Sequence, residues 1–171
     1  MDGESRRRKI IELLAANNQP VSGTEIARIL QVSRQVIVQD IALLRAINKN
    51  ILSTNKGYLL YHPAAMPLKY KRSFCVCHET DEIKEELYTI VDAGGRMIDV
   101  VVEHDIYGQI TVDLLIEDRS DADEFVWKMK NCRTKPLKEL ADGIHYHTIE
   151  AGSLETLDHI EKILGEKGFL G

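Results

Sequence analysis

Long apolar runs and a cysteine framework are both missing from this sequence of 171 residues. No stretch approaches the roughly 20 consecutive apolar residues that a membrane span needs, so we expect no contact with a membrane. The first residues, MDGESRRRK, have no apolar segment behind their charges, and no secretory signal is predicted. Three cysteines without regular spacing suit a reducing compartment, so we expect a cytoplasmic protein. Because 44% of the residues are apolar, wholesale disorder is also excluded.

The net charge of −5 conceals two regions of opposite charge. Residues 1–62 hold nine Lys and Arg against five Asp and Glu, a net charge of +4. Residues 63–171 hold 13 against 22, a net charge of −9. Between them, the segment HPAAMPL carries two prolines that interrupt the flanking patterns. We therefore predict a basic domain over 1–62 that contacts a polyanion, a linker over 63–70 and an acidic domain over 71–171.

The basic region has the element order of a winged helix-turn-helix. Apolar residues at helical spacing predict helices over residues 5–17, 22–30 and 34–48. Ser33 is a good N-cap for the third helix, because its hydroxyl can accept a hydrogen bond from an unpaired backbone amide. Residues 51–61 are predicted to form a hairpin, since two short apolar strands flank an Asn-Lys-Gly turn that tolerates positive φ.

The segment VSGTEIARILQVSRQVIVQDIALLRAINKNILSTNKGYLL resembles the winged-helix module of biotin-operon-repressor-type bacterial regulators. The resemblance implies that the third helix enters the major groove of DNA by its N-terminal end. Arg34 and Gln35 would then reach base edges, since Arg suits guanine and Gln suits adenine. Arg45, Lys56 and the basic run over residues 6–9 would meet phosphates.

The predicted DNA-contacting residues lie on the third helix and in the hairpin. They are Ser33, Arg34, Gln35, Val38, Gln39, Arg45 and Lys56. The alternative is a winged helix used for protein contact, in which the basic run over residues 6–9 is an ordinary solvated face.

The acidic region alternates strand and helix patterns in the order β-α-β-β-α-β, followed by one more helix. Strands are predicted over 70–78, 97–103, 109–116 and 143–150, and helices over 81–93, 120–132 and 153–164. Gly165 is expected to end the last helix. This order matches the ferredoxin-like split β-α-β arrangement. The fold class predicted for the chain is therefore α+β, an N-terminal winged helix-turn-helix followed by a ferredoxin-like (βαββαβ) regulatory domain.

Three histidines and one glutamate are predicted to meet at a corner of this second domain. If the fourth strand pairs antiparallel with the first, His145 and His147 lie close to His78. His145 and His147 are two residues apart on a strand, so they point the same way. Glu86 lies on the following helix and could fold over the same corner. Neutral imidazole and carboxylate suit Zn, Ni, Fe or Cu. The alternative is that these are surface or hydrogen-bonded histidines on a sheet face.

Two neighbouring cysteines offer a different ligand set. The sequence Cys75-x-Cys77-His78 could itself supply metal ligands. Both cysteines alternate with apolar residues on a predicted strand, and free Cys commonly behaves as a small buried hydrophobe. We therefore expect Cys75 and Cys77 to be buried rather than ligating.

With this histidine pattern, the acidic region resembles the 3H domain, and the resemblance covers essentially the whole chain. The best-known members are niacin-responsive repressors of genes for NAD biosynthesis and uptake. The resemblance implies His78, Glu86, His145 and His147 as ligands of one divalent transition metal ion per subunit, nickel or zinc. It also implies a homodimer that binds double-stranded operator DNA, with nicotinic acid as co-repressor near the metal. No motif marks the co-repressor pocket, so no ligand-binding residue is assigned.

Two other functions are compatible with the same pattern. One is a transcriptional regulator that senses the metal itself. The other is a small metal-dependent enzyme with a DNA-binding domain, because three histidines and a glutamate can hold a catalytic zinc ion. The sequence has no H-E-x-x-H, no Gly-rich phosphate loop and no clear nucleophile–base pair, so we predict that the protein is not an enzyme.

Overall fold

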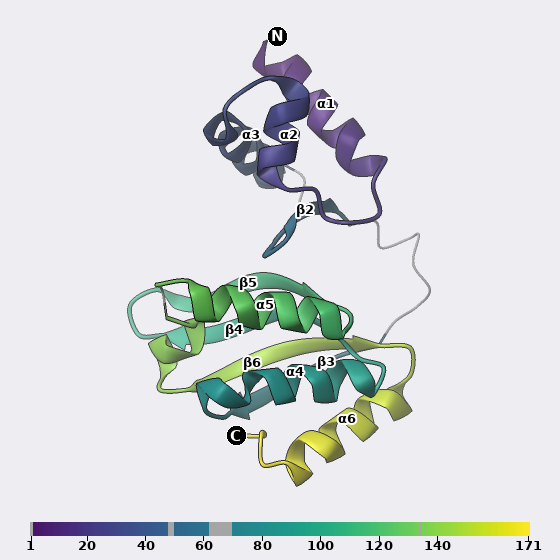
Figure 1. Ribbon diagram of the computed structural model, residues 1–171, viewed down its shortest axis with the longest axis vertical. Coiled ribbons are helices and arrows are strands. Elements are labelled where there is room, and N and C mark those ends of the chain that lie inside the picture. The colour runs from purple at the N-terminus through teal and green to yellow at the C-terminus, as the bar shows by residue number, and fades with distance from the viewer. Residues whose placement is uncertain (1, 48–49, 62–69, 134) are drawn as a thin grey trace. The chain divides into compact units, whose positions relative to one another are not determined.

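The computed structural model describes residues 2–47, 50–61, 70–133 and 135–171. The chain divides into two compact units, Met1–Met66 and Pro67–Gly171 (Figure 1). The predicted linker over 63–70 falls outside the described residues except for its last position, where a strand begins. No helix in the described segments is long and apolar enough to cross a membrane.

The described residues of the N-terminal unit form three helices and a two-stranded hairpin. Helices α1 (Gly3–Ala15), α2 (Gly23–Leu30) and α3 (Arg34–Ile47) precede strands β1 (Ile51–Thr54) and β2 (Gly57–Leu60). Short polar side chains begin the helices: Ser22 accepts a hydrogen bond from Glu25 N, and Ser33 accepts one from Val36 N at 3.3 Å. The predicted helices, the Ser33 cap and the hairpin are confirmed. One apolar core joins them, with Ile10, Leu14, Ile26, Ile37, Ile41 and Ile51 fully or almost fully buried.

The hairpin is fixed to the helices by backbone hydrogen bonds. Val21, just before α2, exchanges bonds with Tyr58 of β2, at 2.8 Å and 2.9 Å between nitrogen and oxygen. Gly57 has a φ of +145°, and a Cβ there would lie 2.4 Å from the Val21 carbonyl oxygen, so only glycine fits. The hairpin and the helix-turn-helix therefore form one body.

Where the C-terminal unit is described, it is a four-stranded antiparallel sheet with three α-helices. Its elements, in chain order, are β3 (Tyr70–Cys77), the 3₁₀ helix η2 (Thr80–Glu82), α4 (Ile83–Asp92), β4 (Arg96–His104), β5 (Gly108–Ile116), α5 (Arg119–Asn131), the 3₁₀ helix η3 (Leu137–Ala141), β6 (Ile144–Ala151) and α6 (Leu154–Glu166). The predicted order of strands and α-helices is confirmed, whereas η3 has no counterpart among the predicted elements. The expected helix end at Gly165 is wrong, because α6 continues to Glu166 and the positive-φ glycine beyond it is Gly168.

The strand order corrects one part of the ferredoxin-like prediction. The sheet runs β3-β6-β4-β5, so the fourth strand of the domain lies between the first and the second. In a ferredoxin-like sheet the third strand takes that place. The burial of the strands agrees with this order: most residues of the inner strand β6 are buried, whereas the first half of the edge strand β5 is largely exposed. The α+β class and the antiparallel pairing of first and fourth strands are confirmed.

The three α-helices and one face of the sheet enclose a single apolar core (Figure 1). Phe74 and Val76 of β3 belong to this core, together with Ile90 of α4 and Leu157 of α6. Residues paired across neighbouring strands share a face of the sheet. Phe74 pairs with His147 and Val76 pairs with His145, so both histidines point to the side that the helices cover.

Candidate metal centre and DNA-contacting helix

Three chain segments bring the predicted metal ligands to one buried corner. His78 follows the last residue of β3, Glu86 lies in the first turn of α4, and β6 carries His145 and His147. All four are buried, with between 1% and 8% of each residue exposed. The central position of β6 in the sheet explains why the two strand histidines are shielded from solvent.

Ligand atoms of three of these residues lie close enough to share one ion. Suitable atoms of His78, Glu86 and His145 are all within 4.8 Å of one another. His147 lies beside this triad: its Nε2 is 3.5 Å from Glu86 Oε1, and its ring centroid is 4.8 Å from that of His145. The structure thus gathers all four predicted residues, with the closest set formed by His78, Glu86 and His145.

Backbone carbonyls fix how the three imidazoles are oriented. Nδ1 of His78 lies 2.9 Å from Glu79 O, Nδ1 of His145 lies 2.8 Å from Gly143 O, and Nδ1 of His147 lies 3.0 Å from Asp99 O. A carbonyl oxygen can only accept, so each Nδ1 carries the hydrogen and donates it. In the neutral ring the lone pair is then on Nε2. Metal-ligating histidines commonly have this arrangement.

The interior of the corner contains polar atoms without hydrogen bonds. Within the described residues, His78 Nε2 and Glu86 Oε1 are buried and make none, although His78 Nε2 is only 2.9 Å from Glu86 Oε2. An imidazole lone pair facing a carboxylate at that distance is repulsive unless a cation or a proton lies between them. The donor set of imidazole nitrogens and a carboxylate fits a divalent transition metal.

The ionisation of these groups reflects the same crowding. Burial and, after it, the neighbouring His147 lower the pKa of His145 to about 4, so His145 stays neutral. Burial alone would also lower the pKa of His78, but the Glu86 carboxylate raises it above its usual value. Burial would raise the pKa of Glu86, yet the surrounding histidines hold it below its usual value. A carboxylate that stays ionised and a neutral imidazole are the forms that bind metal.

The two cysteines lie away from this centre. Cys77 is exposed and Cys75 is partly exposed, so the expectation that both are buried is wrong. They alternate with Phe74 and Val76 and therefore point to the face of the sheet opposite the helices. Because the histidines point the other way, the described geometry does not make these thiols ligands of the same ion.

On the N-terminal unit, the predicted base-contacting side chains share an exposed face of α3. Ser33, Arg34, Gln35, Val38 and Gln39 are all exposed, while Ile37 and Ile41 face the core. Arg45 is also exposed, and its Nε donates to Ile51 O at 3.1 Å, which connects α3 to the hairpin. Lys56 lies in the hairpin turn, where its backbone N donates to Thr54 Oγ1.

The basic run over residues 6–9 is not uniformly exposed. Arg6 Nε lies 2.5 Å from Asp40 Oδ2, and Arg7 Nη1 lies 3.3 Å from Asp40 Oδ1. Asp40 is a buried residue of α3, so these two arginines attach α1 to the predicted recognition helix. Arg8 and Lys9 are exposed, and they are the members of the run whose positions suit phosphate contact.

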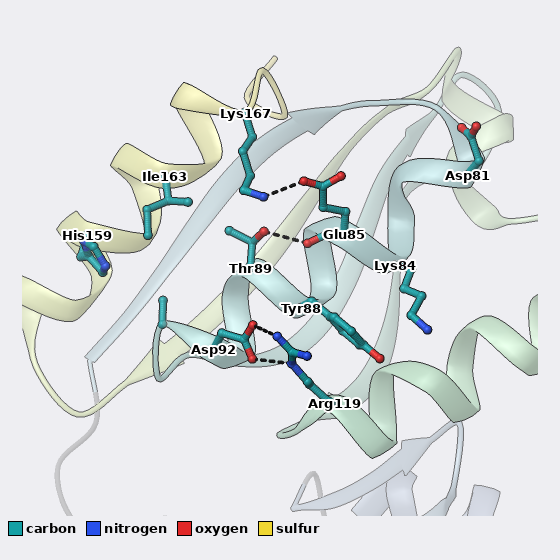
Figure 2. A pocket seen from close by; sticks show the side chains of 11 residues that line it. Asp81, Lys84, Glu85, Tyr88, Thr89, Asp92, Arg119, His159, Ile163 and Lys167 are labelled. Atoms are coloured by element: carbon teal, nitrogen blue, oxygen red, sulfur yellow. Dashed lines mark hydrogen bonds and ion pairs between the residues drawn. The ribbon is translucent and has the colours of Figure 1, made fainter.

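One hollow on the C-terminal unit adjoins the histidine cluster, and another lies apart from it. A cavity of about 560 Å³ is lined by His78 and by residues around η3, including Lys138. The other, of about 580 Å³, lies among α4, α6 and the start of α5 (Figure 2). Its charged side chains pair with each other: Arg119 forms two short contacts with Asp92, and Lys167 lies 2.6 Å from Glu85. Figure 2 shows these pairs bridging the walls of the hollow.

Lys138 is the residue of this site that sequence reasoning missed. It lies in η3 with only 5% of its surface exposed, and its Nζ donates to the backbone carbonyl of His78. A 3₁₀ helix of five residues leaves too little periodicity to be predicted, and a lysine is ordinarily expected at the surface. The sequence signal that could have indicated a turn after η3 is the Asp142-Gly143 pair, because both residues adopt positive φ and form the turn into β6.

Comparison with known proteins agrees with both units. Residues 71–171 match the 3H domain family, and residues 6–59 match a helix-turn-helix domain family. The chain is 43% identical over 167 residues to the probable transcription repressor NiaR of Thermotoga maritima, covering 98% of this chain and 94% of that protein. It is 36% identical over 169 residues to the transcription repressor NadR of Bacillus subtilis, with the same coverage of 98% and 94%.

Proposed function

This chain belongs to the 3H-domain family of helix-turn-helix transcription repressors, and from that premise we propose that it represses genes of NAD biosynthesis or niacin uptake. In this proposal it acts in the cytoplasm as a homodimer, binds operator DNA and uses nicotinic acid as co-repressor. The relatives are named as repressors, in agreement with the prediction that the protein is not an enzyme.

The exposed polar face of α3 is the observation that carries DNA binding. Arg34 and Gln35 stand at the N-terminal end of the helix, which is the end that enters the major groove in such modules. Long polar side chains there can make paired hydrogen bonds to a base edge. Lys56, in the hairpin, and the exposed Arg8 and Lys9 would contact phosphates and orient the unit.

The buried corner supports a resident metal ion. His78, Glu86, His145 and His147 would hold it, through the Nε2 atoms and the carboxylate, and nickel and zinc suit such a donor set. The ion would supply a fixed positive charge inside the regulatory unit. The residues themselves contribute orientation, because the Nδ1 hydrogen bonds hold each ring in place whether or not the ion is bound.

Regulation requires that nicotinic acid bind one form of the dimer better than another. In the favoured form, two copies of α3 would match major grooves about 34 Å apart or a multiple of that distance. The support for this ligand is the resemblance to niacin-responsive repressors, together with the cavity that adjoins His78. We expect the acid to tighten operator binding.

A gel-shift or anisotropy titration tests the proposal and separates it from metal sensing. The probe is a duplex selected from random-sequence DNA by the metal-loaded protein. We expect nicotinic acid to tighten binding by the metal-loaded protein and to have little effect on chelated protein. If metal alone produced the full change and nicotinic acid added nothing, the protein would be a metal sensor. If neither changed operator binding, ligand-responsive repression would be wrong.

A further inference from the structure

A buried lysine stands beside the histidine cluster without a carboxylate partner. In the described part of the chain, no Asp or Glu oxygen lies within 4.0 Å of Lys138 Nζ, and its hydrogen bond goes to the His78 carbonyl. An ammonium group has three hydrogens to donate, and burying it with one neutral acceptor is unfavourable. Arg96, the other buried cation among the described residues, does have carboxylate partners, because it donates to both Glu117 and Glu150.

The cavity next to Lys138 has an acidic rim and a cationic floor. Glu79, Glu82, Glu139 and Asp142 line it and lie nearer the surface, whereas Lys138 is buried. Glu79 and Glu82 already cap the helix that starts there, since Glu82 accepts a hydrogen bond from Glu79 N at 2.7 Å. Glu139 lies 2.7 Å from Lys135 at the surface. Glu79, Glu82 and Glu139 therefore have partners of their own and leave the ammonium to an incoming group.

We infer that this cavity binds a small monocarboxylate and that the Lys138 ammonium holds the carboxylate group. This inference rests on the proposed function, of which it names the ligand contact. The cavity volume of about 560 Å³ is within the usual range for small-molecule sites, roughly 300–1,000 Å³. A single negative charge offsets the buried cation, while the rim repels ligands with further negative charges, such as phosphate esters.

Calorimetric titration of the metal-loaded full-length protein tests the inference with three probes. Nicotinic acid supplies the carboxylate, nicotinamide is its uncharged counterpart, and nicotinic acid mononucleotide adds a phosphate. We expect wild-type protein to prefer the acid over the amide by about 10- to 100-fold, the range for a hydrogen bond between charged groups. The mononucleotide should bind more weakly than the acid, and Glu139→Gln should narrow that difference.

The matched variants are Lys138→Met and Lys162→Met, which remove a buried lysine that lines the cavity and an exposed lysine of α6 that does not. Lys138→Met should weaken binding of the acid by about 10-fold or more, with metal content unchanged, and it should hardly affect the amide. Lys162→Met should bind the acid like the wild type. Metal content and thermal unfolding of each variant show whether the site is still folded.

Several outcomes would overturn the inference. They are equal affinity of the wild-type protein for acid and amide, no binding of the acid at all, and wild-type acid affinity in Lys138→Met. The first two outcomes need no variant, so they can overturn the inference even if Lys138→Met fails to fold. Conversely, if the acid bound through Lys138 but operator affinity did not change, the inference would stand and the proposed co-repressor role would fail.

Discussion

The two units differ most in what they bury. Among the described residues of the N-terminal unit, the only buried charged or polar residue is Asp40, and two arginines pair with it. The described part of the C-terminal unit buries eight such residues, among them His78, Glu86, Lys138 and His145. Burying ionisable groups is unfavourable unless partners compensate them. Buried ionisable groups are therefore concentrated in the described part of the second unit, where a cation and an anion would complete the pairing of its polar groups.

In the proposed function, this difference separates the unit that would read DNA from the unit that would sense the ligand. The apolar core of the first unit supports the exposed face of α3, which in this proposal contacts DNA. In the other unit, incomplete pairing makes stability depend on what is bound, because any ligand that binds only the folded state adds to its stability. Metal binding should therefore reveal the contrast most strongly.

Metal should stabilise the C-terminal unit alone. At a free concentration about 1,000 times the dissociation constant, Ni²⁺ or Zn²⁺ should raise the unfolding free energy of this unit by about 4 kcal/mol. Hydrogen-exchange mass spectrometry of chelated and metal-loaded protein measures both units in one sample. Protection should increase in β3, β6 and α4 and stay the same in α1, α2 and α3. Equal changes in both units would contradict the contrast.

Removing a ligand should abolish that stabilisation. His145→Ala is expected to weaken metal binding by at least about 100-fold, more than the loss of an outer-shell partner of a metal site. His159→Ala removes an exposed histidine of α6 and is the control. His147→Ala should also weaken binding, and metal analysis after dialysis measures each loss. Unchanged binding in His147→Ala would reduce the site to the triad of His78, Glu86 and His145.

The sequence predicts those parts of the fold and of the candidate site that depend on helical or strand periodicity. Helix faces and strand alternation predict both units, and the antiparallel pairing of β3 with β6 is enough to gather the histidines. That pairing holds whichever strand lies on the far side of β6, so the sequence predicts the cluster although it does not predict the strand order. The burial expected for Cys77 is wrong because alternation tells which residues share a face but not which face the helices cover.

The burial and pairing of charged residues are the features that the sequence predicts least well. Lys138 and Asp40 would be expected in solvent from residue type alone, and their burial depends on tertiary neighbours far along the chain. The basic run at residues 6–9 looks uniform in the sequence, yet two of its arginines point to Asp40, 33 and 34 residues away. A sequence pattern does not show such a pair, because neither element indicates how it will pack against the other.

On the N-terminal unit, base contacts and phosphate contacts should respond differently to mutation. Arg34→Ala should weaken binding to the selected duplex by about 1–3 kcal/mol and relax the preference at one base pair. Lys56→Ala should weaken binding to all sequences alike and lower the salt dependence of log K by about one. Anisotropy titrations at several salt concentrations, on selected and random duplexes, measure both. If Arg34→Ala bound the two duplexes as the wild type does, α3 would not be the recognition helix.

Breaking the buried contact between Asp40 and its two arginines should have a smaller effect. Asp40→Asn keeps the shape of the side chain but removes the charge that Arg6 and Arg7 contact. We expect a loss of about 1 kcal/mol in the stability of this unit, because the arginines are partly exposed and can turn to water. Metal binding should not change. A drop in protection within β3 or β6 would show that the two units are coupled.

The smallest expected effect is a dependence of metal-free stability on pH, confined to the C-terminal unit. Burial lowers the pKa of His145 to about 4, whereas in the unfolded chain the group has its ordinary pKa of 6.5. Between these values the unfolded state binds a proton that the folded state refuses, so stability falls as the pH is lowered. From pH 7 to pH 6 the loss attributable to His145 is less than about 1 kcal/mol. This loss is measured by comparing the pH dependence of the unfolding free energy in wild type and in His145→Gln, both in chelator. His78, whose pKa is raised, contributes a pH dependence of the opposite sign, but it is present in both proteins. An identical pH dependence in the two proteins would mean that His145 is not held neutral by its surroundings.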